Sequence, residues 1–252
     1  MKAPNKEKLI VIAEDFYIRS NFPNCLGAVY GKHIRLMAPQ HSGSQYFNYK
    51  KFFSVVLMAI ADANYCFVAV DIGAYGKEGD SNVFKRSTSG KRLYGNKLYI
   101  PESRSLPYSN GPAQPFVFVA DEAFGLHTNL LRPYCRRNFD DRIQIFNYRL
   151  TGARRFVECT FGILANKCRV FHNLILVHPD FAVQIIKAAC ALHNFVRKRY
   201  GYQFEDSLSC NLDDIAVTGT GGNRQTANAV RDFFANYFIT PEEAVQWQQH
   251  MI

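Results

Sequence analysis

The sequence of 252 residues predicts an α/β fold. Two apolar, β-branched runs, 53–61 and 65–72, are separated by Asp62-Ala63-Asn64, which is typical of a β-hairpin. A compact apolar strand over 116–120 stops at Asp121, and a clear helical period follows over 148–171. Strands in succession, then a strand followed by a long helix, favour a mixed sheet covered by helices.

The remaining elements follow in chain order. Asn5 is a suitable N-cap for an amphipathic helix that ends near residue 20. Residues 26–37 alternate loosely and predict the first strand, while Asp80 or Ser81 is expected to cap a short helix. Glycine and proline recur over 88–115, which we interpret as an irregular insertion before the fourth strand. A helix from Pro179 to Val196 is apolar nearly all round, so we expect it to be buried.

Composition excludes several classes of protein. With 48% apolar and 20% charged residues, the chain has enough apolar material for a folded core and is not a disordered, collagenous or coiled-coil chain. The longest apolar run, 55–61, is far shorter than the roughly 18 residues that a transmembrane helix needs, so we expect no contact with a membrane. The seven cysteines show no zinc-ligand spacing, and we predict reduced thiols in an intracellular protein that is not secreted.

The expected elements and a shift in composition near residue 201 divide the chain into three parts. We expect an amphipathic helix over 1–21, a main domain over 22–200, and an acidic C-terminal linker with helices over 201–252. The net charge is +9, and nine basic residues against three acidic ones lie between Arg132 and Arg169. This excess is typical of a surface that binds a polyanion, although a solvated charged face would look the same in the sequence.

Two acidic residues lie where an active site is expected. Asp121 follows a buried strand, and Glu158 lies on the helix over 148–171 with Arg154 one turn earlier. The order of elements suits a ribonuclease-H-like sheet, in which acids from the first strand, the fourth strand and a following helix hold two divalent cations. The alternatives are a strand-end turn residue for Asp121 and a simple ion pair with Arg154 for Glu158.

Six segments across residues 22–199 then establish a family resemblance. The chain resembles the PIF/Harbinger superfamily of transposases and transposase-derived nucleases, whose motifs appear here in order as FPNCLGAVYGKHI from Phe22, NYKKFFS from Asn48, the Asp71-Ile72-Gly73 to Gly79-Asp80 segment, ADEAF from Ala120, RRFVECTFG from Arg154 and LHNF from Leu192.

The resemblance implies a DDE nuclease that cleaves DNA with Mg²⁺ or Mn²⁺. Its second and third catalytic acids carry over as Asp121 and Glu158, which are the expected metal ligands. The first acid does not carry over, because its position is Tyr30. A phenol is neutral at pH 7 and binds Mg²⁺ poorly, so we expect two-metal catalysis to be impaired. Acids that could substitute for the missing one are Asp71, Asp80 and Glu122.

The expected partner is DNA, and the expected location is the nucleus. The candidate phosphate contacts are basic residues before, on and just after the Glu158 helix, namely Arg136, Arg137, Arg154, Arg155, Lys167 and Arg169. In this superfamily a helix-turn-helix module usually precedes the nuclease domain, and we interpret residues 1–21 as its remnant. A separate Myb-like protein often assists DNA binding. The alternative function is a catalytically inactive DNA-binding or protein-binding relic of a transposase.

Overall fold

A five-stranded mixed sheet lies at the centre of the protein. The computed structural model describes residues 3–135, 140–200, 224–241 and 243. The strand order is β3-β2-β1-β4-β5, in which β1 to β3 are antiparallel and β4 and β5 run parallel to β1. The strands are β1 (Cys25–Arg35), β2 (Ser54–Ala61), β3 (Phe67–Tyr75), β4 (Val117–Val119) and β5 (Leu130–Leu131). This arrangement confirms the predicted α/β class, the hairpin and the ribonuclease-H-like mixed sheet.

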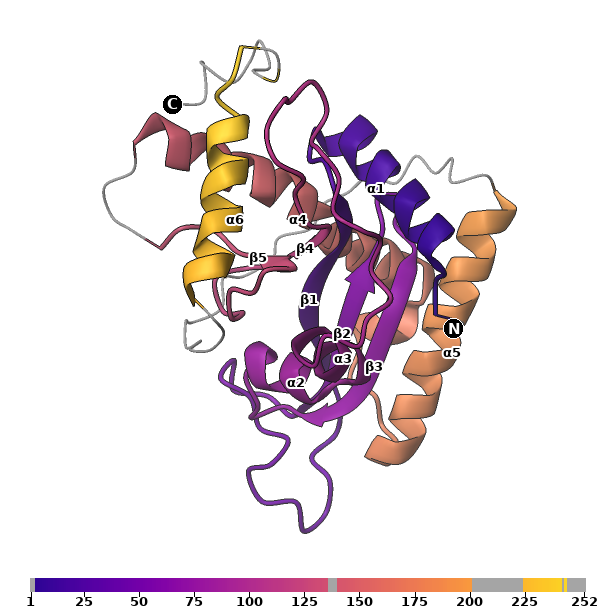
Figure 1. The fold of residues 1–252 in the computed structure, drawn as a ribbon. Helices are drawn as coiled ribbons and strands as arrows, with labels where there is room; N and C mark the ends of the chain where they lie inside the picture. The colour runs from indigo at the N-terminus through magenta and orange to yellow at the C-terminus, as the bar shows by residue number, and fades with distance from the viewer. Residues whose placement is uncertain (1–2, 136–139, 201–223, 242, 244–252) are drawn as a thin grey trace.

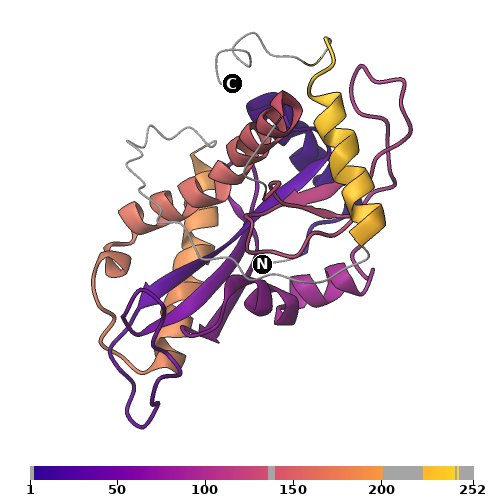
Figure 2. The same cartoon turned by 90° about the vertical axis from the view of Figure 1, so that its left-hand side faces the viewer.

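Helices cover both faces of the sheet. In Figure 1, α4 and α5 lie behind the sheet and α2 and α3 lie in front of it; the turned view in Figure 2 shows the strands between these two layers. The helices are α1 (Lys6–Ser20), α2 (Asp80–Arg86), α3 (Thr88–Tyr94), α4 (Asp141–Lys167), α5 (Pro179–Arg199) and α6 (Arg224–Tyr237), with a short 3₁₀ turn at Arg169–His172. Because both faces are covered, every residue of β2 is buried, which explains its continuous apolar sequence.

Helix α1 belongs to the same hydrophobic core as the sheet. The Asn5 side chain accepts a hydrogen bond from the backbone N–H of Lys8, which confirms the predicted cap. Leu9, Ile12 and Phe16 are buried in the core that also contains β1. The Phe16 ring lies 5.4 Å from the Phe156 ring of α4. Helix α1 therefore stabilises the sheet directly through apolar burial.

Long helix α4 is anchored by a buried arginine. Arg149 is 1% exposed, and its guanidinium donates hydrogen bonds to the backbone oxygens of Asn21, at 3.0 Å, and Glu243, at 2.7 Å. Its charged carbon lies 5.1 Å from the centre of the Phe238 ring. These contacts tie α4 to the end of α1 and to the residues that follow α6.

Two side chains of α5 fix the β2–β3 hairpin. Nε2 of His193 lies 2.7 Å from the carbonyl oxygen of Tyr65. The Asn194 amide accepts from the N–H of Phe67 and donates to its carbonyl, both at 2.8 Å. The LHNF segment therefore stabilises the edge of the sheet, and His193 is a buried histidine with a hydrogen-bond partner.

Three expectations about the elements need correction. The insertion over 88–115 is not wholly irregular, because α3 occupies 88–94. Helix α5 is not buried all round: Phe181, Leu192 and Phe195 are each 60% exposed, because only one side of the helix packs on the sheet. Helix α4 begins at Asp141, seven residues before the expected start, and Asp140 caps it.

Several other predictions have a structural counterpart. Helix α6 lies within 201–252, where helices were expected without stated bounds; its Phe234 ring stacks on Phe22 with centroids 5.7 Å apart. Within the described residues, no helix has the length and apolarity needed to span a membrane. The six cysteines in the described part are free thiols, as predicted, while Cys210 lies outside it. The predicted glycine-rich linker over 219–222 also lies outside the described residues.

Candidate active site

Tyr30 and Asp121 occupy equivalent levels on neighbouring parallel strands. Ala28 of β1 is paired with Val119 of β4, so residues 30 and 121 each lie two positions beyond that pair. Strand β4 ends at residue 119, and Asp121 begins the loop that follows. One oxygen of Asp121 accepts the backbone N–H of Ala123 at 2.9 Å, which fixes the carboxylate at the end of the strand. Tyr30 is 5% exposed.

Glu158 reaches the same region from α4. Its carboxylate forms an ion pair with Arg154, with Nη1 and Oε1 2.7 Å apart, and both side chains are largely shielded from solvent. The Arg154 guanidinium carbon lies 6.0 Å from the centre of the Tyr30 ring. The centres of the Tyr30 and Phe161 rings are 6.3 Å apart. The ion pair that the sequence allowed as an alternative therefore exists, and it lies beside Tyr30.

Asp80 is the third carboxylate of this region. It was expected to be a helix cap, but Gly79 is the N-cap residue and Asp80 is the first helical residue, 3% exposed. Its carboxylate packs on the backbone of Gly31, where an added Cβ would lie 2.4 Å from Oδ1. Oδ2 is buried and has no hydrogen-bond partner among the residues that the structure describes. Only glycine at position 31 leaves room for this acid.

Electrostatics show that these groups share one neighbourhood. Burial raises the pKa of the Tyr30 hydroxyl, and the negative charges of Asp121, Asp80 and Glu158 raise it further, while Arg154 opposes them. The phenol is therefore neutral throughout the physiological pH range. Burial and the charge of Asp121 raise the pKa of Asp80 to about 7, although a hydrogen bond from the Gly31 backbone opposes the shift. Burial also raises the pKa of Asp121.

The other two candidate substitute acids lie less centrally. Glu122 is adjacent to Asp121 and raises its pKa through charge repulsion. Asp71 lies on β3, in line with Met58 of β2 and Gly31 of β1, which places it two strands or about 10 Å from Gly31. The carboxylate of Asp71 lies 3.4 Å from the backbone N–H of Thr88.

The candidate phosphate contacts separate in the structure. Arg154 faces the acids, whereas Arg155 is exposed on another side of α4. Lys167 and Arg169 are exposed at the C-terminal end of α4 and in the turn after it. Arg136 and Arg137 lie outside the described residues.

Comparison with known proteins identifies the family. The family model for the DDE superfamily endonuclease matches residues 29–194, which is more than half of the chain. The chain belongs to the DDE superfamily of endonucleases. It is 30% identical over 199 residues to "Protein ALP1-like" of Arabidopsis thaliana, covering 75% of this chain and 47% of that protein. It is 23% identical over 186 residues to "Putative nuclease HARBI1" of Rattus norvegicus, covering 73% of this chain and 49% of that protein.

The chain thus spans about half the length of the curated relatives it matches. No solved structure matches it. The Harbinger resemblance of the sequence is confirmed by both relatives and by the DDE family model.

DDE endonucleases use divalent metal ions, and the residues of this chain do not fit a complete two-metal set. Within the described ranges, no three Asp, Glu, His or Cys side chains converge closely enough to hold one ion. The position that the resemblance assigns to the first acid carries the neutral phenol of Tyr30, which is a poor ligand for Mg²⁺. The acids that remain are Asp121, Glu158 and the nearby Asp80.

Sequence reasoning left one feature of this DDE site undetected. It did not identify Gly31 as the residue that admits Asp80, because the contact joins positions 49 residues apart and depends on how α2 packs on β1. The only signal was the glycine directly after Tyr30 inside the predicted first strand, where glycine often marks close approach of another group.

Proposed function

We propose that this DDE-family domain binds DNA and that its metal-dependent cleavage of phosphodiester bonds is impaired. The observation that carries the proposal is the position of Tyr30, which lies buried among Asp121, Asp80 and Glu158. A third carboxylate at this point would help to neutralise two divalent cations and would bring both into line with the scissile bond. The phenol supplies no charge, and its ring occupies space beside the acids.

Binding to DNA is supported by charge. The chain carries a net charge of +9, and Arg155, Lys167 and Arg169 expose their side chains on and after α4. Contacts to phosphate from such residues give an affinity that is independent of sequence and falls steeply with salt. A nuclear location and a Myb-like partner protein, which the Harbinger resemblance implies, belong to the same proposal.

Restoring the missing acid tests the proposal directly. We expect the unmodified protein to leave supercoiled DNA intact in Mn²⁺ and Tyr30→Asp to nick it, with Asp121→Ala in the Tyr30→Asp background abolishing the gain. Mn²⁺ binding by calorimetry gives a second readout, and we expect Tyr30→Asp to bind at least tenfold more tightly than Tyr30→Phe. The Phe variant is the matched control because it removes the hydroxyl without adding charge.

Two outcomes would count against impaired cleavage. Nicking by the unmodified protein that Asp121→Ala abolishes would show an active nuclease. Failure of Tyr30→Asp to gain either nicking or Mn²⁺ affinity, in a folded protein, would favour the alternative of an inactive DNA-binding or protein-binding relic whose site has decayed more widely.

One observation favours a second candidate function, a residual nuclease that uses Asp80 in place of the first acid. The unpartnered Oδ2 of Asp80 and its proximity to Asp121 are the basis for it. In that case the unmodified protein nicks DNA in Mn²⁺ and Asp80→Asn abolishes the activity. If Asp80→Asn leaves weak nicking unchanged, this second candidate is excluded.

A further inference from the structure

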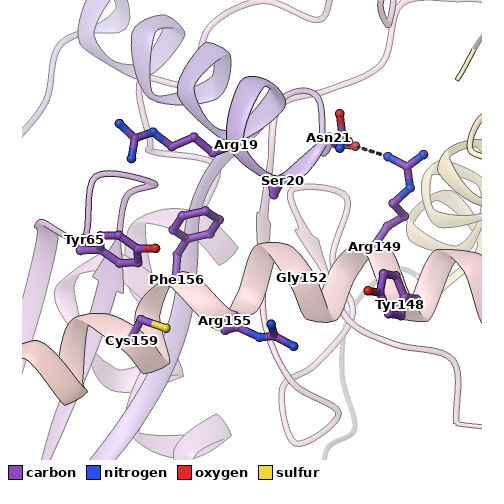
Figure 3. Close-up of a pocket in the computed structure, with 10 residues that line it drawn as sticks. All are labelled: Arg19, Ser20, Asn21, Tyr65, Tyr148, Arg149, Gly152, Arg155, Phe156 and Cys159. Atoms are coloured by element: carbon purple, nitrogen blue, oxygen red, sulfur yellow. Dashed lines mark hydrogen bonds between the residues drawn. The ribbon is translucent and has the colours of Figure 1, made fainter. Parts of the chain in front are cut away.

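A pocket of about 260 Å³ lies between the C-terminal end of α1 and α4, on a side of α4 that the acids do not share. In Figure 3 the end of α1 with Arg19 forms one wall, and α4 with Gly152 and Arg155 forms the other. Tyr65 lies at one end, and Tyr148 lies at the other. Arg155, a candidate phosphate contact of the proposed DNA binding, lines the pocket together with Phe156 and Cys159 of the same RRFVECTFG segment, so a role in binding phosphate here rests in part on that proposed function.

The charged residues of the pocket are all cations. Arg19, Arg149 and Arg155 line it, and no Asp or Glu of the described residues does. The Arg149 guanidinium donates a hydrogen bond to the carbonyl oxygen of Asn21 and closes one end of the pocket. Neither Arg19 nor Arg155 forms an ion pair within the part of the chain that the structure describes. Arg19 and Arg155 therefore line one cavity from separate elements with no acidic side chain among the described lining residues, and in Figure 3 their side chains extend toward opposite ends of it.

Tyr65 is held in place by its surroundings. It adopts a left-handed backbone conformation at the β2–β3 turn, with φ of 59°, which is uncommon for an aromatic residue. The His193 ring lies within hydrogen-bond distance of the Tyr65 carbonyl oxygen. The Tyr65 ring lies 5.2 Å from the Phe156 ring, and the Arg197 guanidinium lies 5.3 Å from the centre of the Tyr65 ring. Burial raises the pKa of its hydroxyl, whereas Arg19, Arg197 and Arg155 lower it, so these cations surround the phenol. A fixed neutral hydroxyl thus faces the cationic cavity.

Gly152 leaves the wall of α4 open. A Cβ at this position would meet no atom within 4 Å, and the backbone is not in the left-handed region. Neither packing nor conformation therefore requires glycine here, although glycine weakens a helix relative to alanine. What glycine provides is free space between α4 and Arg19.

We propose that this pocket binds the phosphate group of a nucleotide. Guanidinium groups recognise phosphate through paired N–H donors, and two of them from different walls, with the Tyr65 hydroxyl as a further donor, suit an anion with three or four oxygens better than a carboxylate with two. Tyr148, which is 40% exposed, offers an aromatic face at the other end for a base. The nucleotide is either a free mononucleotide or one residue of a DNA strand, and the site is separate from the acids.

Calorimetry in EDTA, which removes divalent ions from the acid site, tests this inference. The probes are deoxyadenosine 5′-monophosphate, deoxyadenosine, a twelve-residue single-stranded oligonucleotide and a glutamate-rich peptide. We expect the monophosphate to bind at least tenfold more tightly than the nucleoside. Arg155→Gln and Arg19→Gln should each weaken it about tenfold, and Gly152→Leu, which fills the cavity, should abolish binding. Lys91→Gln, which changes an exposed cation on α3, should leave it unchanged.

The two sources of the phosphate give different results. Binding of the monophosphate that Gly152→Leu removes indicates a free nucleotide, whereas Gly152-dependent binding of the oligonucleotide alone indicates a strand of DNA. If neither probe binds in a way that depends on Gly152 and on the two arginines, or if only the acidic peptide does, the inference is wrong. Thermal unfolding of each variant shows that it is folded, and the arginine variants keep the test decisive should Gly152→Leu fail to fold.

Discussion

The two neighbouring arginines of α4, Arg154 and Arg155, serve different regions of the molecule. Arg154 is paired with Glu158 at 2.7 Å and lies over Tyr30, inside a group of acids. Arg155 is exposed and lines a pocket together with other arginine residues and two tyrosine residues. Consecutive helical residues point about 100° apart, so a motif that is continuous in the sequence is divided between two sites. Two residues that are adjacent in one sequence motif, such as Arg154 and Arg155, can therefore belong to different sites.

The two regions also differ in how charge is balanced. On the acid side, Asp80 is buried and Asp121 is partly buried, and burial raises the pKa of both carboxyl groups. On the pocket side, the exposed side chains of Arg19 and Arg155 lie in a pocket that Tyr65 and Tyr148 also line. The acid side stores unfavourable electrostatic energy in the folded state, while the pocket side is open to a ligand that would balance it.

The largest expected effect concerns Asp80→Asn and its dependence on pH. The folded protein keeps the Asp80 proton up to about pH 7, whereas the unfolded chain loses it near 3.8. The unfolded state therefore binds fewer protons in this window, and stability falls as pH rises. Relative to Asp80→Asn, the unmodified protein should lose roughly 3 kcal/mol of unfolding free energy between pH 5 and pH 8.

Urea denaturation of both proteins at several pH values measures this difference. His33, whose pKa burial lowers to about 4, destabilises both proteins equally in acid and cancels in the comparison. If the unfolding free energies of the two proteins changed in parallel with pH, Asp80 would not hold its proton up to neutral pH in the folded state. The proposed difference in charge balance between the acid side and the pocket side would then be wrong.

The next effect compares Arg154→Gln with Arg155→Gln. Loss of Arg154 removes the ion pair with Glu158 and the cation that lowers the pKa of Asp121. We expect a loss of about 2 kcal/mol at pH 7, because both members of the pair are mostly shielded. Arg155→Gln should change stability by less than about 0.5 kcal/mol. If thermal or urea unfolding showed equal losses of stability for the two variants, the proposed difference between the environments of Arg154 and Arg155 would be wrong.

The smallest effect is a gain from Gly152→Ala. The added Cβ meets no neighbour, and alanine stabilises a helix interior relative to glycine by about 0.5 to 1 kcal/mol. Urea denaturation should therefore show a more stable protein, while nucleotide affinity falls slightly because the pocket is narrower. A loss of stability would show that the wall of α4 is packed more tightly than the structure indicates.

Much of this arrangement was predictable from local pattern. Alternation and β-branched residues predicted the hairpin, Asn5 predicted the first helix, and spacing predicted the long helix that carries Glu158. Asp121 was located by the end of an apolar strand, and the structure places it beside Tyr30. These features depend on residues that are near one another in the sequence, so periodicity and capping rules suffice.

The remaining features depend on contacts between distant segments. Nothing near Asp80 shows that it packs on Gly31 instead of capping α2, and helix propensity favoured the cap. The exposed side of α5 could not be distinguished from its buried side because both are apolar. The pocket requires the end of α1, the β2–β3 turn and α4 to meet, and its lining residues, from Arg19 to Cys159, are 140 positions apart.

The contact between Asp80 and Gly31 also constrains how the site could change in evolution. An aspartate at position 30 would add a further negative group next to two acids that are already difficult to ionise. Without a bound cation that reversion would destabilise the domain, whereas the tyrosine relieves the repulsion and adds apolar burial. If tyrosine replaced the first acid, as we propose, the change is difficult to reverse, because an aspartate at position 30 would need bound cations to offset this repulsion.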